Sequence, residues 1–214
     1  MAYTEPNDAS PFVPEERSLG ALREAAAACR GCHLWRNATQ TVFGEGRTRS
    51  RVMFVGEQPG DQEDRKGRPF VGPAGRELDR ALEEAGIARD DVYITNVVKH
   101  FKFEERGKRR IHQTPKKFEI DACRPWLDGE LEQVDPEALI VLGATAGKAL
   151  LGSKFRLRES RGRMLDSPLA PIVTATIHPS AILRAPDDQS RQEERRLFTE
   201  DLRTVAQEIA ARRD

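Results

Sequence analysis

The chain has 214 residues, of which 35 are lysine or arginine and 35 are aspartate or glutamate, so its formal net charge is zero. This length suits one α/β domain with short arms, and the balanced charge means that any attraction to nucleic acid must come from local basic patches. No apolar run approaches the roughly 20 residues that span a bilayer, and the N-terminus is acidic where a signal peptide is basic, so we expect a cytoplasmic protein without membrane contact. Its three cysteines then suit a metal site better than a disulfide framework.

The N-terminal segment predicts an arm followed by a helix. Residues 1–17 carry three prolines and several acidic side chains without hydrophobic periodicity. This composition predicts a flexible arm, and the remainder, 18–214, then forms a single domain. Residues 18–29 are rich in alanine, which favours a helix, and Ser18 is suited to cap its N-terminus.

Cysteines end this helix in the sequence Cys29-Arg-Gly-Cys32. Such a pair occurs in zinc sites, redox pairs and iron–sulfur sites, and it needs partners elsewhere to hold a metal. Cys123 is the one further cysteine, and His100 is the candidate for a fourth ligand, although it could also be a half-buried structural histidine. His33 completes the attachment motif of c-type haem, but that attachment requires export, for which we see no signal.

A long segment between a strand and a helix is the best candidate for a ligand site. Residues 51–55 are apolar and β-branched, as in a buried strand, and residues 75–85 carry apolar side chains at the spacing of one helical face. The loop from Gly56 to Gly75 is long for such a connection, and in an α/β sheet it lies where ligands bind. It matches neither the dinucleotide nor the phosphate-binding loop pattern, and it could also be an ordinary surface connection.

Further strands and helices alternate along the chain. Apolar runs predict strands over 92–97, 138–142 and 172–177, and helical patterns predict helices over 118–134, 144–151 and 191–212. Alternation of this kind is typical of a parallel sheet with helices on both faces. We therefore expect an α/β fold with three layers, α/β/α, around a central four-stranded parallel sheet.

Polar residues follow or end three of these strands. Glu57 follows the first strand, Asn96 lies near the end of the second, and His178 follows the fourth. Because parallel strands end at one edge of a sheet, we expect the three side chains to lie close together. The Asn96 amide offers both a donor and an acceptor, which suits the edge of a base such as uracil, although a buried asparagine can also be structural.

A basic segment, 101–117, leaves the second strand at the same edge. It contains Lys108-Arg109-Arg110, with His112 just beyond. A charge run is often only a solvated face, but the position of this one makes contact with nucleic-acid phosphates an equally good interpretation.

Six motifs in this order resemble those of the iron–sulfur uracil-DNA glycosylases of families four and five, over roughly 29–202. They are Cys29-x-x-Cys32-x-Leu34, Gly56-Glu57-x-Pro59-Gly60, Pro69-Phe70-Val71-Gly72, Asn96-Val-Val-Lys99, Glu119-x-x-x-Cys123-Arg-Pro-Trp and His178-Pro179-Ser180. Three departures resemble the UdgX branch instead: His100 in place of a third cysteine, a longer basic loop, and Gln58. Members of that branch excise uracil and remain covalently joined to the abasic DNA through the loop histidine.

The resemblance implies a role for each matching residue. Phe70 would stack on an extruded uracil, Asn96 would bind its Watson–Crick edge, and His178 would donate to its O2 oxygen. The base would also be bound by residues of the first motif and its neighbour, namely Gln58, Gly60 and Asp61. His112 would attack the sugar, with Glu57 accepting its proton.

The resemblance also implies a cofactor and a partner. A 4Fe-4S cluster would be held by Cys29, Cys32, His100 and Cys123. The protein would act as a monomer on uracil-containing DNA, single- or double-stranded, which it would contact through Lys108, Arg109, Arg110, Ser180 and Arg184. Two alternatives remain open: a glycosylase that turns over normally, in which His112 only contacts DNA, and a non-catalytic DNA-binding module with a structural metal.

Overall fold

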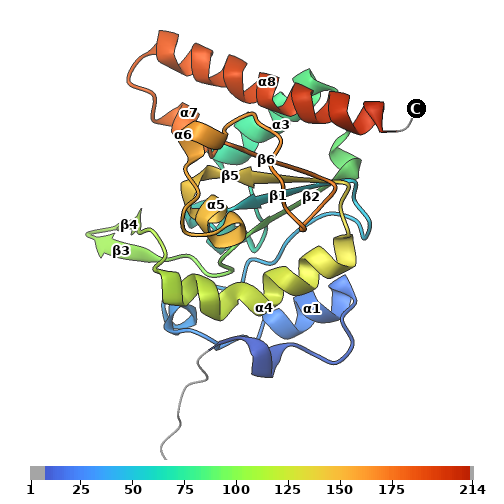
Figure 1. Cartoon of the computed structure of the whole chain (residues 1–214). Helices are drawn as coiled ribbons and strands as arrows, with labels where there is room; N and C mark the ends of the chain where they lie inside the picture. The colour runs from blue at the N-terminus through green and yellow to red at the C-terminus, as the bar shows by residue number, and fades with distance from the viewer. Residues whose placement is uncertain (1–7, 213–214) are drawn as a thin grey trace, which may run out of the picture.

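A four-stranded parallel sheet forms the centre of the computed structural model, which describes residues 8–212. Its strand order is β2-β1-β5-β6, from β1 (Val52–Gly56), β2 (Val92–Asn96), β5 (Ala138–Leu142) and β6 (Ile172–Thr176) (Figure 1). Every residue of these strands is buried, as expected for parallel strands that are covered on both faces. The four expected strands are confirmed, each to within one residue at its ends.

One face of the sheet is covered by α1 (Leu19–Ala26), α4 (Lys117–Val134) and α5 (Gly143–Leu151). Strand residues such as Met53 and Val55 point to this face and pack with the fully buried Trp126 of α4. Ser18 caps α1, since its side chain accepts a hydrogen bond from the Ala21 backbone N–H at 3.3 Å.

The opposite face is covered by α3 (Pro73–Ala85) and α8 (Asp188–Ala211), which lie side by side in Figure 1. The alternate strand residues, such as Phe54, pack here with Leu78 of α3 and Phe198 of α8. The predicted three-layer α/β/α architecture is therefore confirmed. Helix α8 begins three residues earlier than expected because the Asp187 side chain caps it, accepting from the Ser190 N–H at 2.7 Å.

Short elements complete the fold within residues 8–212. They are α2 (Asp61–Lys66), α6 (Leu157–Ser160), α7 (Ser180–Leu183) and three 3-10 helices, Ser10–Phe12, His33–Arg36 and Arg89–Asp91. Helix α2 lies inside the segment that was expected to be a continuous loop. It begins at Gly60, whose N–H bonds to the side chain of Glu63, and it ends at Gly67, which has a left-handed φ of 70°.

The basic segment forms a β-hairpin, where the sequence predicted a loop. Strands β3 (Phe103–Arg106) and β4 (Arg109–His112) pair antiparallel and project from the body of the domain (Figure 1). Gly107, with a φ of 60°, makes the tight turn possible. The strands have four residues each and are mostly charged and exposed, so they lack the hydrophobic alternation that identifies a strand.

The N-terminal segment that was expected to be a flexible arm begins outside the described residues, which start at residue 8. Within the described part, Ala9 is buried, and its backbone N–H donates to the Ala122 carbonyl of α4 at 2.8 Å. This portion of the segment is therefore packed on the domain. Among residues 8–212, no helix is both long enough and apolar enough to cross a membrane.

Candidate active site

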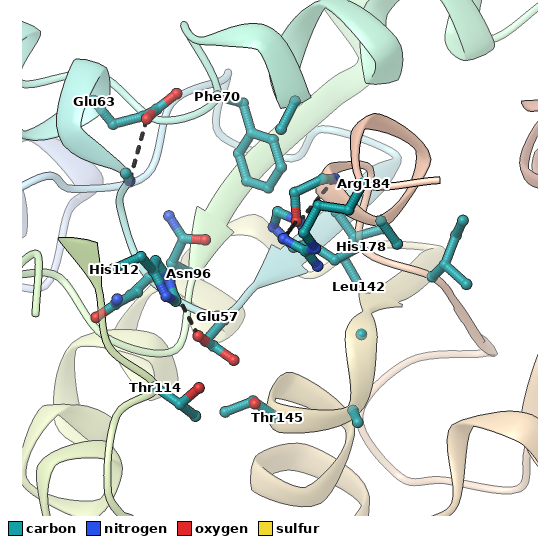
Figure 2. Close-up of a pocket in the computed structure, with 18 of the residues that line it drawn as sticks. Glu57, Glu63, Phe70, Asn96, His112, Thr114, Leu142, Thr145, His178 and Arg184 are labelled. Carbon is teal, nitrogen blue, oxygen red and sulfur yellow. Dashed lines mark hydrogen bonds and ion pairs between the residues drawn. The ribbon is translucent and has the colours of Figure 1, made fainter. Parts of the chain in front are cut away.

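The carboxyl ends of the parallel strands surround a pocket of about 670 Å³. Glu57, Asn96 and His178 follow or end strands β1, β2 and β6, and all three line this pocket (Figure 2). The rule that parallel strands end at one edge therefore brings together the three side chains that were singled out from the sequence.

Asn96 lines the pocket at its floor, and it pairs in register with Gly56 at the ends of β2 and β1. The Asn96 side chain is buried, and its Oδ1 has no hydrogen-bond partner. A Cβ atom on Gly56 would clash with this Oδ1 and lie 2.9 Å from Phe70 Cζ, so the glycine keeps the space between amide and ring open. Because an unpaired buried acceptor costs about 1–3 kcal/mol, the floor suits a ligand that brings an N–H donor.

Phe70 forms one wall of the pocket. Its φ of 53° lies in the left-handed region, which costs on the order of 1–3 kcal/mol for a residue with a side chain. Gly75 makes this conformation possible, since a Cβ at that position would overlap the Phe70 carbonyl oxygen. The Phe70 ring lies 5.6 Å from the His178 ring, centroid to centroid. Strain of this kind at a pocket wall is typical of a functional position.

The buried carboxylate of Glu63 holds the two ends of this loop together. It accepts the Gly60 N–H at 3.1 Å and the Gly72 N–H at 2.7 Å, and these glycines begin α2 and α3. A carboxylate at two helix N-termini is favoured by both helix dipoles. Glu63 therefore fixes the pocket wall between Glu57 and Phe70. The sequence analysis did not single out this residue, although its position three residues after Gly60 is the spacing of a capping box.

His178 presents one defined nitrogen to the pocket. Its Nδ1 accepts the Ser180 backbone N–H at 3.2 Å and lies 2.8 Å from the Ser180 hydroxyl, which in turn accepts from Arg184 at 3.0 Å. The hydrogen of a neutral His178 must therefore sit on Nε2. Burial lowers the pKa of His178 to about 4, and the positive charge of Arg184 acts in the same direction. At neutral pH this side chain is an uncharged N–H donor.

His112 reaches the pocket from the end of strand β4. Its Nε2 lies 3.3 Å from Oε1 of Glu57, and the two side chains are 47% and 19% exposed (Figure 2). Burial lowers the pKa of His112, Glu57 opposes this effect, and Arg184 adds to it. A neutral imidazole beside a carboxylate is an arrangement that can act as a nucleophile with its base.

Gln58 connects the pocket loop to the base of the hairpin. Its amide nitrogen donates to the backbone oxygens of Lys102 at 3.1 Å and Gln113 at 3.0 Å, and its oxygen accepts from the Lys102 N–H at 3.0 Å. Lys102 precedes β3 and Gln113 follows β4. The Gln58 side chain lines the pocket but uses its hydrogen bonds on the hairpin, whereas the resemblance assigned it to the base.

The residues expected to contact DNA fall into different environments. Lys108 and Arg109 are exposed at the hairpin turn, and Ser180 and Arg184 line the pocket. Arg110 is instead only 11% exposed and is bonded to Asp61 and Asp64 of α2. Asp61, expected at the base, is thereby engaged with Arg110 and with Arg65, and it is not among the residues that line the pocket.

The candidate metal ligands lie between α1, β2 and α4. Cys29, Cys123 and His100 are buried, and Cys32 is half-buried. The Cys29 sulfur accepts hydrogen bonds from Trp126 Nε1 at 3.2 Å and from the Gly31 N–H at 3.5 Å. The Cys123 sulfur accepts the Lys99 N–H at 3.3 Å. Hydrogen bonds of this kind to sulfur are among the means by which proteins stabilise iron–sulfur clusters.

His100 has one nitrogen left for a ligand. The Thr41 hydroxyl donates to the Ala26 carbonyl at 2.8 Å, so it can only accept from His100 Nε2, 2.9 Å away. Among residues 8–212, no three His, Cys, Asp or Glu side chains converge so as to hold a single metal ion. A four-iron cluster bonds each ligand through a different iron, so its ligands need not converge on one point. The three sulfurs and one imidazole nitrogen are donors that fit an iron–sulfur cluster as well as a zinc ion.

Sequence comparisons relate the chain to known proteins. Residues 43–203 match the sequence model of the family described as Uracil DNA glycosylase superfamily. A type-4 uracil-DNA glycosylase of Thermotoga maritima is 39% identical over 188 residues, which cover 87% of this chain and 92% of the relative. One of Saccharolobus solfataricus is 32% identical, covering 91% and 88%. A type-5 uracil-DNA glycosylase of Pyrobaculum aerophilum is 36% identical over 62% of each chain.

Proposed function

Because the chain belongs to the uracil-DNA glycosylase superfamily, we propose that it excises uracil from single- and double-stranded DNA and that His112 then bonds to the abasic sugar. The unpaired Oδ1 of Asn96 beside the Phe70 ring carries the first half of this proposal. Uracil N3–H matches that acceptor, uracil O4 matches the Asn96 amide donor, and the flat base matches the ring. The base must leave the stack to reach the pocket.

Excision breaks the bond between C1′ of the sugar and N1 of uracil, and the electron pair leaves with the base. His178 Nε2–H donates to O2 of the departing uracil, where negative charge develops. A fixed neutral donor stabilises this charge without reorganisation, and such electrostatic stabilisation is the largest contribution in many enzymes. The sugar is left as an oxocarbenium ion.

The pairing of His112 with Glu57 carries the second half. One imidazole nitrogen of His112 faces Glu57, and the other can give its lone pair to C1′. The proton on the nitrogen that faces Glu57 passes to the carboxylate, so the ring ends neutral. Placed beside the cation, the imidazole has a large effective concentration and is a better nucleophile than water. The neutral product has a poor leaving group, so the bond persists.

Replacement of His112 tests this step against normal turnover. We expect His112→Ala to lose the denaturant-resistant protein–DNA band while uracil release continues, with water in the vacated place. His33→Ala is a matched control, because His33 is 46% exposed and lies 3.3 Å from a glutamate, Glu119, outside the pocket. A band that persists in His112→Ala, or an adducted peptide that excludes His112, would show that this residue is not the nucleophile.

Replacement of Asn96 tests the base-reading floor. Asn96→Ala removes both hydrogen bonds to the uracil edge, which costs on the order of 1–3 kcal/mol before any loss of orientation. We expect uracil release to slow in single-turnover measurements on a labelled oligonucleotide. Release at the parent rate would contradict the role of Asn96, whereas no release from the parent protein itself would favour a binding module without glycosylase activity.

A 4Fe-4S cluster on Cys29, Cys32, His100 and Cys123 completes the proposed enzyme. Its role is structural, because its ligands tie α1 and α4 to the end of β2, beside the pocket floor. DNA contacts come from the exposed hairpin turn and from Ser180 and Arg184. A single chain carries all of these groups, so the proposed reaction needs no second copy, in keeping with a monomer. Iron and acid-labile sulfide assays test the cluster, and a colourless protein with stoichiometric zinc would contradict it.

A further inference from the structure

Arg110 occupies a socket on the body of the domain. Its Nε bonds to Asp61, its Nη1 donates to Asp64 Oδ2 at 2.6 Å and to Thr39 Oγ1 at 3.2 Å, and its Nη2 donates to the Asp61 carbonyl at 3.3 Å. Each of the three guanidinium nitrogens therefore has a partner. We refer to Asp61, Asp64 and Thr39 as the Arg110 socket.

Two aromatic rings also contact the Arg110 guanidinium. The Arg110 Cζ atom lies 5.4 Å from the centre of the Phe101 ring and 4.9 Å from that of the Phe103 ring. These rings stack on each other, and the Phe101 ring is also 6.1 Å from the His112 ring. Arginine is suited to such a place because its planar group can pair with carboxylates at its edge and stack on aromatic faces.

Arg110 and His112 lie on the same face of strand β4. Side chains alternate along a strand, so residues two apart point the same way. The register of the hairpin agrees, since Phe103 pairs with His112 and Glu105 pairs with Arg110. The contacts that fix the Arg110 side chain therefore also fix the part of strand β4 that carries His112.

The socket is itself fixed to the pocket. Asp64 is fully buried and accepts the Thr39 N–H at 2.9 Å, which ties α2 to the segment after the cysteine pair. Its neighbour Glu63 holds Gly60 and Gly72, which lie at the starts of α2 and α3. Helix α2 thus links the wall of the pocket directly to the guanidinium.

We propose that Arg110 is a positioning residue for His112: its side chain, seated between Asp61 and Asp64, places the imidazole against the sugar and makes no contact with the DNA backbone. This inference rests on the proposed covalent step. It assigns the hairpin arginines different tasks, with Arg110 buried in its socket and Arg109 exposed to DNA.

The partition between two products tests this assignment. After uracil leaves, the sugar is captured either by His112 or by water, so the adduct formed per uracil released reports the position of His112 in folded protein. We expect Arg110→Gln to lower this ratio at least about tenfold, since displacements near 1 Å can cost 100-fold. Uracil release itself, which depends on the pocket floor, should stay within a few-fold of the parent.

Conservative and control variants sharpen the result. Arg110→Lys can engage only part of the socket, so it should restore the ratio partially. Arg106→Gln removes a hairpin arginine that pairs only at the surface with Glu104, and it should leave the ratio unchanged. Asp61→Asn combined with Arg110→Gln should be no worse than Arg110→Gln alone, because partners in one contact are non-additive.

Binding to uracil-free DNA distinguishes the socket from a phosphate contact. The loss of one phosphate contact lowers the slope of log affinity against log salt by about one. We expect Arg110→Gln to keep the salt dependence and the affinity of the parent. A lower salt slope together with a normal adduct ratio would overturn the inference in favour of DNA contact.

The parent protein separates failure of this inference from failure of the covalent step. If the parent forms no adduct on His112, the proposed function fails, whatever Arg110 does. If the parent forms it and Arg110→Gln keeps the parent ratio, the proposed function stands and the positioning role of Arg110 is wrong.

Discussion

The floor of the pocket and the hairpin above it are held in different ways. Gly56 and Asn96 end neighbouring strands of the main sheet, whose backbones are paired and whose side chains are buried. The hairpin projects from the domain, its strands are mostly exposed, and it is attached at its base by Gln58 and along one face by Arg110. One region is fixed by the sheet itself, the other by a few side chains.

This difference divides the proposed reaction between two supports. The floor reads the base and releases it, so a change there should slow uracil release and leave the fate of the sugar unaltered. The hairpin delivers His112, so a change there should alter the fate of the sugar and spare release. Two measurements on one reaction, uracil released and adduct formed per uracil, therefore assign any residue to one support.

The largest effect is expected from Gly56→Ala. The new methyl group would occupy the space between the Asn96 amide and the Phe70 ring, and a base displaced by about 1 Å can lose 100-fold in rate. We expect single-turnover uracil release to fall by about that factor, with the adduct per uracil unchanged. Gly20→Ala is the control, since a Cβ there meets nothing within 4 Å. Release at the parent rate would show that the space between Gly56, Asn96 and Phe70 does not hold the base.

Gln58→Leu should affect the hairpin alone. It leaves the Lys102 N–H and the Gln113 carbonyl without the partner that Gln58 supplies, while the Lys102 carbonyl still accepts the Gln113 N–H. At a cost of about 1–3 kcal/mol, capture by His112 should fall by roughly 5- to 150-fold. The adduct per uracil should therefore drop while release is retained, and the exposed Gln62→Leu should change neither. A selective loss of uracil release would instead return Gln58 to the base, as the resemblance to related enzymes implied.

The pH dependence should separate the two histidines. Capture requires neutral His112, whose pKa is lowered from 6.5 by burial, so capture should be complete at pH 7 and decline only as the pH falls through a value below 6.5. His178 has a pKa of about 4, so it stays an uncharged donor, and release should continue at pH 5. Adduct yield and uracil release measured from pH 4.5 to 8 should diverge at acid pH; parallel loss would contradict the division.

The smallest effect is expected at the tip of the hairpin. Lys108→Gln with Arg109→Gln removes two exposed charges, which should lower the slope of log affinity against log salt by about two. At saturating protein, both release and capture should match the parent. An unchanged slope in a binding titration would exclude the turn from the DNA interface.

The positions of Glu57, Asn96 and His178 could be predicted because a single topological rule applies to all of them. Each follows or ends a buried strand, and parallel strands end at one edge. The rule needs only the strands, and their apolar, β-branched runs identify them within one residue.

The role of Arg110 could not be read in the same way. A basic run beside a binding loop has the same composition whether it faces phosphate or carboxylate, and the partners Asp61 and Asp64 lie 49 and 46 positions away in the chain. Nothing local in the sequence indicates such pairs. The hairpin itself was hidden for a related reason, because its short strands owe their stability to contacts with the body rather than to their own pattern.

The socket has a consequence for protein engineering. If the hairpin with its histidine were transplanted into a turnover glycosylase, it would lack the contacts that hold it to the body of the domain. The recipient would also need acidic side chains at the positions of Asp61 and Asp64, a hydroxyl at the position of Thr39 and an amide at the position of Gln58. Conversely, if His112 bonds to the abasic sugar as proposed, an enzyme that already carries these residues would need few further substitutions to bond to uracil-containing DNA.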